Sequence, residues 1–248
     1  MRAPDPIAFT LFGMDVRWYG LLIGIGFLLA IFLSYKRAPK YGIKEDHVLD
    51  FALFMIPAAI IGARAYYVIF HWDYYGGDIG RILDIRSGGL AIHGGLIAGI
   101  LVAFAVCKYH KIIFADLADL CLPTVALAQS IGRWGNFFNS EAHGGPTDLP
   151  WAIYVDGQYV HPTFLYESIW CFALFLFLMF YMEKRRSFSG QLGLLYGILY
   201  SLERIFVEQL RTDSLMLGPF KQAQVLSFCV IVVCIVLYVY LWRKERKQ

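Results

Sequence analysis

Charged residues are scarce in this sequence of 248 residues, where Asp, Glu, Lys and Arg together make up 17%. An average soluble domain carries about 25%. Hydrophobic residues reach 58%, and the mean hydropathy is +0.56. This composition excludes a disordered chain and argues against an ordinary soluble domain. The net charge of +3 is too small to indicate a nucleic-acid partner.

The sequence also lacks the marks of a disulfide framework, a metal site or a soluble cofactor site. Its cysteines form no CxxC pair, are odd in number and stand in apolar runs, which argues against disulfides and structural zinc. No P-loop, dinucleotide fingerprint, HExxH or GxSxG motif is present. We therefore expect no metal and no cofactor. The cysteines are Cys107, Cys121, Cys171, Cys229 and Cys234.

Long apolar runs dominate what is there. A membrane-spanning helix needs ~20 mostly apolar residues, and seven stretches come close to that length. The fourth and the sixth are the least apolar. The sequence thus predicts an all-α integral membrane protein, with one polytopic domain over residues 1–248 and an outward-facing loop at 134–163. The stretches are about 18–35, 50–70, 88–107, 114–133, 164–182, 190–210 and 222–242.

Lysine and arginine are distributed unevenly over the segments between these stretches. If the N-terminus lies outside, thirteen basic residues lie on the inner side and six on the outer side. The positive-inside rule then predicts an N-terminus outside and a C-terminus in the cytoplasm, which an odd number of spans permits. The outer six are Arg2, Arg17, Arg81, Arg86, Arg211 and Lys221.

Polar residues in and beside the predicted spans gather at one depth, apart from Asp116 and Asp119, which are expected at the inner interface. Ionisable groups in a membrane cost several kcal/mol, so each needs a reason. With the N-terminus outside, these residues lie toward the outer leaflet, where they predict a polar site. They are Tyr19, Arg64, His93, Arg133, His161, Glu167, Tyr200, Arg204, Glu208 and Arg211.

The sixth span carries the most regular of these patterns. At ~100° per residue, Tyr200, Arg204, Glu208 and Arg211 fall on one narrow face. A structural ion pair between Arg204 and Glu208 is one explanation. The second arginine leaves positive charge over, which favours an anionic ligand.

Two further segments carry candidate chemistry. Arg133 ends the fourth span and leads into the run WGNFFNSE, which supplies fork-shaped donors, carboxamides and glycines suited to phosphate. An ordinary capped helix end is the alternative. His93 stands among four glycines, which would let a backbone or a headgroup approach it. It can accept a proton, or it is a hydrogen-bonded structural histidine.

The same segments resemble a known family. The blocks are RWYG at 17–20, GLAIHGG at 89–95, GRWGNFFNSE at 132–141, HPTFLYE at 161–167 and RIFVEQLR at 204–211. They resemble phosphatidylglycerol–prolipoprotein diacylglyceryl transferases, in order, over about residues 7–240. The resemblance implies an enzyme of the bacterial plasma membrane with its active site toward the outer leaflet. It implies transfer of diacylglyceryl from phosphatidylglycerol to the lipobox cysteine thiol of a preprolipoprotein, giving a thioether and glycerol 1-phosphate.

Residue roles follow from the resemblance together with the shared depth. We expect His93 to act as base, directly or through a water, although Glu141 or water alone remain alternatives. Arg133 and Arg204 are expected to hold the departing phosphate. The expected substrate-binding residues are Tyr19, Arg133, Asn136, Asn139, Glu141, Gly144, Tyr200, Arg204 and Glu208, with Arg64, His161 and Arg211 as weaker candidates.

Other functions remain open from the sequence alone. A transporter usually places charged groups near the membrane midplane and often has internal repeats, neither of which is evident here. A lipid phosphatase would use water in place of a thiol. A structural assembly protein would not need three arginines within its spans. The resemblance implies phosphatidylglycerol, lipobox peptides and the lipid bilayer as partners, and we expect no nucleic acid.

Overall fold

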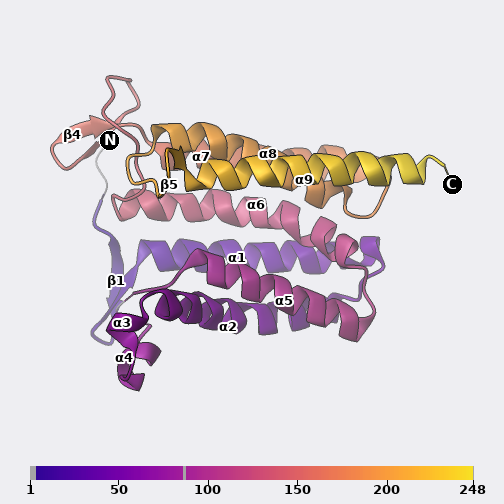
Figure 1. The fold of residues 1–248 in the computed structure, drawn as a ribbon, viewed down its shortest axis with the longest axis horizontal. Coiled ribbons are helices and arrows are strands. Elements are labelled where there is room, and N and C mark those ends of the chain that lie inside the picture. The colour runs from indigo at the N-terminus through magenta and orange to yellow at the C-terminus, as the bar shows by residue number, and fades with distance from the viewer. Residues whose placement is uncertain (1–3, 86–87, 248) are drawn as a thin grey trace. The chain divides into compact units, whose positions relative to one another are not determined.

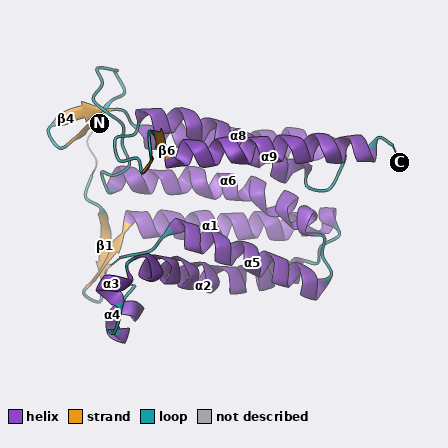
Figure 2. Cartoon of the chain, in the orientation of Figure 1, coloured by secondary structure: helices purple, strands orange, loops and turns teal. Residues whose placement is uncertain are grey.

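The computed structural model describes residues 4–85 and 88–247, so that Arg2 and Arg86 lie outside the described residues. Helices dominate it (Figures 1 and 2). The long ones coincide with the seven predicted stretches within a few residues. They are α1 (Trp18–Arg37), α2 (Glu45–Phe70), α5 (Ile92–His110), α6 (Phe114–Phe138), α7 (Thr163–Leu176), α8 (Gln191–Leu210) and α9 (Gln222–Glu245).

Two of these helices continue into tighter or wider turns. A 3-10 turn, η1 (Ala38–Tyr41), follows α1, and α7 runs on through a π-helical segment, η2 (Phe177–Met182), and a 3-10 turn, η3 (Glu183–Arg185). Two short helices, α3 (Trp72–Tyr75) and α4 (Ile79–Leu83), follow α2.

Among the described residues, six of the long helices, taken with their continuations, are long and apolar enough to cross a membrane. The all-α membrane architecture predicted from the sequence is thereby confirmed. The remaining helix, α8, has 20 residues but carries Glu203, Arg204 and Glu208. The fourth and sixth predicted spans, which are the least apolar in sequence, correspond to α6 and α8. Of these, α6 is apolar enough to cross a membrane by composition alone, whereas α8 is not.

Three short antiparallel hairpins, which the sequence analysis does not predict, interrupt the helical pattern. They pair β1 (Ile7–Leu11) with β2 (Met14–Arg17), β3 (Ile153–Val155) with β4 (Gln158–Val160), and β5 (Met216–Leu217) with β6 (Phe220–Lys221). Because α6 extends to Phe138, the predicted loop at 134–163 begins with helix and contains the β3–β4 hairpin. A small apolar core fixes that hairpin, and it consists of Phe137, Ile153, Val155, Val160 and Phe164.

The chain divides into two compact units, Met1–Leu33 with Ala118–Gln248, and Ser34–Leu117. We call them the first and the second unit. In the first unit, α8 packs against α7 and α9. The fully buried Asp119 fixes the start of α8, since its carboxylate accepts hydrogen bonds of 2.8 Å from the amides of Gly190 and Gly193. Arg186 neutralises that carboxylate at 2.7 Å.

In the second unit, α2 and α5 lie side by side. Glycine permits their closest approach, because a Cβ placed on Gly62 would lie only 2.6 Å from the Gly94 carbonyl oxygen. The amide of Ala91 donates to the Ala63 carbonyl at 3.0 Å, which ties the start of α5 to the backbone of α2. This contact fixes the place of His93 along α2.

Candidate active site

A fully buried carboxylate, Glu167 in the first turns of α7, lies at the centre of the polar cluster in the first unit. One of its oxygens accepts a hydrogen bond of 2.7 Å from Nη1 of Arg204 on α8. Its other oxygen forms an ion pair of 3.2 Å with Nη1 of Arg133 on α6. The structure therefore brings together the two arginines that the sequence analysis assigns to the phosphate.

The helical stripe on α8 supplies the next contacts. Glu208 pairs with Nη2 of Arg204 at 2.7 Å, which is the ion pair expected from the i, i+4 spacing. The hydroxyl of Tyr200 accepts a hydrogen bond of 3.3 Å from Nη2 of Arg133. These contacts engage two nitrogens of each guanidinium, which carries five N–H donors in all.

The stripe does not leave the surplus positive charge that its sequence suggests. Arg211 lies one residue beyond the end of α8, and its guanidinium forms a two-pronged contact with Asp213 at 2.7 and 2.9 Å. These hydrogen bonds from Arg211 hold the pKa of Asp213 below its ordinary value. The expectation is corrected because Glu167 and Asp213, which lie off the helical face, give both arginines of the stripe a carboxylate partner.

A second polar group lies at the C-terminal end of α6. Glu141 folds back over the helix end, where its Oε1 accepts hydrogen bonds from the side-chain amides of Asn136 at 2.9 Å and Asn139 at 3.3 Å. Ser140 and Ala142 flank Glu141 with positive φ angles of 53° and 55°, which non-glycine residues rarely adopt. The sharp reversal of the chain is what aims Glu141 at the two carboxamides.

Tyr19 packs against the same helix end. A Cβ placed on Gly135 would lie 2.5 Å from Cδ2 of Tyr19 and 3.2 Å from its Cα. The ring of Trp18 stacks on Phe138 with centroids 5.1 Å apart. Gly135, the second glycine of the GRWGN block, is therefore required for the start of α1 to approach α6.

Gly144 and His161 form a backbone junction near the end of α8. The Gly144 amide donates to the His161 carbonyl at 2.9 Å, and a Cβ on Gly144 would meet His161 Cβ at 2.7 Å. Gly144 also bridges to Arg211 as an isolated antiparallel pair. The Lys221 ammonium donates to the Glu208 carbonyl at 2.6 Å and the Arg211 carbonyl at 2.9 Å, which caps α8. Gly144, His161 and Arg211 are thus brought together by backbone contacts.

In the second unit, buried Arg64 is saturated by backbone carbonyls. Nε donates to Ile82 at 2.9 Å, Nη2 to Arg81 at 2.6 Å, and Nη1 to Gly88 at 2.7 Å and Gly89 at 2.9 Å. Its guanidinium also lies 4.8 Å from the ring centroid of Tyr75. Arg64 therefore fastens both α4 and the segment after it to α2, and little of its donor capacity remains for a ligand.

His93 lies at the start of α5 and is partly exposed. Its ring centroid is 6.0 Å from that of Tyr66, in a tilted arrangement. Two of the neighbouring glycines, Gly88 and Gly89, have φ angles of 92° and 74°, and a Cβ on Gly89 would lie 2.5 Å from Nη1 of Arg64. The close approach predicted for these glycines is made by the Arg64 side chain and the α2 backbone.

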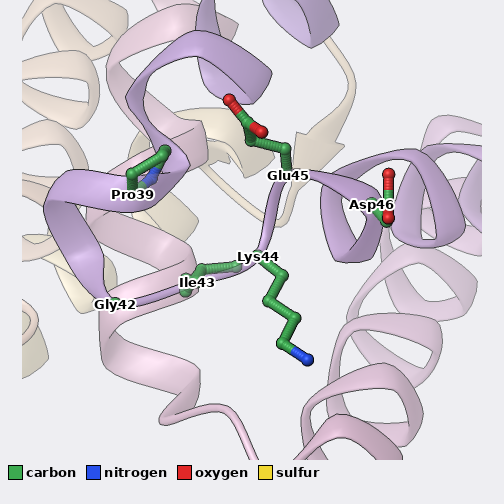
Figure 3. Close-up of a pocket in the computed structure, with 6 residues that line it drawn as sticks. All are labelled: Pro39, Gly42, Ile43, Lys44, Glu45 and Asp46. Atoms are coloured by element: carbon green, nitrogen blue, oxygen red, sulfur yellow. The ribbon is translucent and has the colours of Figure 1, made fainter.

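An open pocket of the second unit lies elsewhere, at the turn between η1 and α2 (Figure 3). Its lining contains none of the predicted site residues, and the side chains of Lys44 and Glu45 point in opposite directions. Within residues 4–85 and 88–247, no group of three or more His, Cys, Asp or Glu is placed to hold a metal ion. The pocket is lined by Pro39, Gly42, Ile43, Lys44, Glu45 and Asp46.

Comparison with known proteins decides the family. The family model of prolipoprotein diacylglyceryl transferase matches residues 6–240. The chain belongs to this family. The phosphatidylglycerol–prolipoprotein diacylglyceryl transferase of Clostridioides difficile is 51% identical over 98% of both chains. Proteins of the same name are 48% identical in Finegoldia magna, over 98% of this chain and 97% of the relative, and 46% identical in Bacillus cytotoxicus, over 94% and 90%.

Membership of the prolipoprotein diacylglyceryl transferase family confirms the resemblance seen in the sequence. The chain is accordingly a transferase and, with its apolar helices, a multi-pass membrane protein. The sequence analysis assigns no role to Glu167, although it lies in the HPTFLYE block and at the right depth. Its burial between two arginines of other helices is a tertiary property, and the sequence points to it only through that block and its predicted depth.

Proposed function

We propose that this membrane enzyme transfers the diacylglyceryl group of phosphatidylglycerol to the lipobox cysteine thiol of preprolipoproteins. The products are a thioether-linked lipoprotein precursor and glycerol 1-phosphate. The observation that carries the proposal is the pair of arginines, Arg133 and Arg204, joined by one carboxylate. The charge pattern of the sequence predicts that this pair lies toward the outer leaflet. The names of the relatives supply the two substrates.

The reaction makes three demands on the site. The thiol, with a free pKa near ~8.5, must lose its proton to a base so that the thiolate can attack. The sulfur must lie in line with the glycerol carbon and its phosphate oxygen. A C–S bond forms as the C–O bond breaks, and the electron pair of that bond leaves with the phosphate. Positive charge fixed at the departing phosphate lowers the barrier.

The roles follow from the chemistry of the groups. Arg133 and Arg204 present their remaining N–H donors to the phosphate, and Glu208 and Tyr200 fix their orientation. His93 takes the thiol proton, directly or through a water. The glycerol headgroup is bound by Tyr19, Asn136, Asn139, Glu141 and Gly144.

We place the protein in the bacterial plasma membrane with seven spans, the N-terminus outside and the C-terminus in the cytoplasm. The asymmetry of lysine and arginine supports this orientation. α8 counts as the seventh span because Arg204 pairs with Glu208 on the same helix and with Glu167 on α7. Pairing reduces the cost of placing them in the membrane.

A transfer reaction with purified components tests the proposal. The full-length protein in lipid is mixed with phosphatidylglycerol and a lipobox peptide, and mass spectrometry follows the peptide. We expect a gain of one diacylglyceryl unit, release of glycerol 1-phosphate, and no gain on a peptide whose cysteine is replaced by serine. No gain from folded protein, beside an active relative in the same lipid, would refute the proposal.

The base is tested separately with His93→Gln. A glutamine keeps a polar side chain but cannot take a proton, so the rate of transfer should fall by about 100-fold or more, within the range for general-base catalysis. The rate is measured from pH 6 to 9. Near wild-type turnover across that range would show that His93 is not the base and that Glu141 or water accepts the thiol proton.

A further inference from the structure

Glu167 is a buried carboxylate to which the proposed function assigns no role. Its side chain is 1% exposed, whereas those of Arg133 and Arg204 are about one-fifth exposed, at 21% and 20%. Each carboxylate oxygen faces a different arginine, and the two arginines come from different helices. Glu167 is thus shut off from the surface, whereas both arginines that it contacts are partly exposed.

The two arginines depend on Glu167 to different degrees. Arg204 has a second carboxylate partner in Glu208, on its own helix. Arg133 has only the Tyr200 hydroxyl besides Glu167 among the described residues. Removing the Glu167 charge would leave Arg133 without an anionic partner in a largely buried place, where an unpaired charge moves or draws in water.

We propose that Glu167 is the positioning residue of the phosphate site, which sets the spacing and direction of the Arg133 and Arg204 guanidiniums. One rigid carboxylate shared by two forks holds both at the geometry that a single phosphate needs, before the lipid binds. Such preorganisation lowers the barrier because the donors need not reorient during the reaction. The proposal rests on the transferase activity proposed above and adds to it the residue that aligns the two arginines.

Glu167→Gln tests this role, since the amide keeps the size of the side chain and removes its charge. The amide NH₂ also turns a donor toward one of the arginines. We expect kcat/KM for phosphatidylglycerol to fall about 100-fold, with kcat carrying most of the loss and a thermal transition that shows a folded protein.

Ser168→Ala is the matched control on the next residue of α7. Ser168 is buried, exchanges hydrogen bonds with Ser130 at 2.8 Å and accepts one from Nε1 of Trp134 at 3.1 Å. It makes no hydrogen bond to either arginine. Its loss should lower the thermal transition and leave kcat and KM within about twofold of wild type. Equal kinetic losses in the two variants would mean that Glu167 matters only for packing.

A double-mutant cycle separates positioning from general stability. If Glu167 acts through Arg133, the double variant Glu167→Gln/Arg133→Gln should lose at least about tenfold less than the product of the single losses. Losses that simply multiply would overturn the proposal. Wild-type protein without transfer activity would instead refute the proposed function, so the two failures are distinguishable.

Discussion

Each arginine of the site works through its shape as well as its charge. A guanidinium offers donors in a planar fork, so that Arg204 binds Glu167 with one nitrogen and Glu208 with another while further N–H groups stay available. A lysine ammonium at the same place carries the charge on one point and cannot make both contacts in one plane. The site should therefore distinguish arginine from lysine.

Arg133→Lys and Arg204→Lys should each lower kcat/KM for transfer by about 10- to 100-fold, since a charge-assisted hydrogen bond contributes about 1.5–3 kcal/mol. Initial rates at varied phosphatidylglycerol measure this. Arg243→Lys, an exposed site in the last turn of α9, is the control and should retain wild-type rates. Full activity in both site variants would show that charge alone suffices.

Gly135→Ala changes one hydrogen for a methyl group at the Tyr19 contact. The new Cβ would lie 2.5 Å from Tyr19, so the start of α1 must move away, and transfer should fall by at least about tenfold. Gly132→Ala is its control on the same helix, because the nearest atom there, on Ile23, would be 3.8 Å away. Crosslinking between α1 and α6 would report the displacement. Equal activities would mean that the Tyr19 contact is dispensable.

Sequence reasoning reaches individual residues when the partner lies on the same helix. The Arg204–Glu208 pair follows from a spacing of four residues, and the structure confirms it at 2.7 Å. The spacing does not predict the pairing of Glu167, whose partners come from α6 and α8. It also does not predict the pairing of Asp213 with Arg211 beyond the helix end. Helical periodicity carries no information on such contacts.

At the scale of elements, the apolar runs predict the long helices well because membrane length and helical rise together fix their extent. The short hairpins escape prediction, since β3–β4 and β5–β6 depend on local turns and on a few packed side chains. The structure of the segment between α2 and α5 is likewise not predicted from the sequence. It has little apolar packing, and buried Arg64 fastens it through carbonyl oxygens.

Arg64→Lys should release that segment. One ammonium cannot reach the carbonyls of Arg81, Ile82, Gly88 and Gly89 together, so amide hydrogen exchange in residues 79–85 and 88–95 should accelerate by at least about tenfold. Peptides from α8 and α9 should exchange as in wild type. Arg81→Lys in the same segment is the control, since its side chain is 55% exposed and pairs with Asp78 at the surface.

At the scale of the whole molecule, α8 decides the topology. If it spans, the chain crosses seven times and its ends lie on opposite sides of the membrane. If it does not, six spans remain and both ends lie on the same side. The basic residues favour the first arrangement, because Lys184, Arg185 and Arg186 precede α8 on the predicted inner side. The pairing of Arg204 with two carboxylates supplies the physical means for α8 to cross.

Single cysteines on either side of α8 measure this directly, in a protein whose five native cysteines are replaced and whose activity is retained. Lys184→Cys and Leu215→Cys are both at exposed positions. With a membrane-impermeant maleimide and intact cells, position 215 should react at once and position 184 only after permeabilisation. Gln158→Cys and Lys44→Cys serve as outer and inner references. Labelling of positions 184 and 215 from the same side would show that α8 does not cross the membrane. Arg204 would then not lie at the predicted depth in the outer leaflet, and the proposed phosphate site would be wrong.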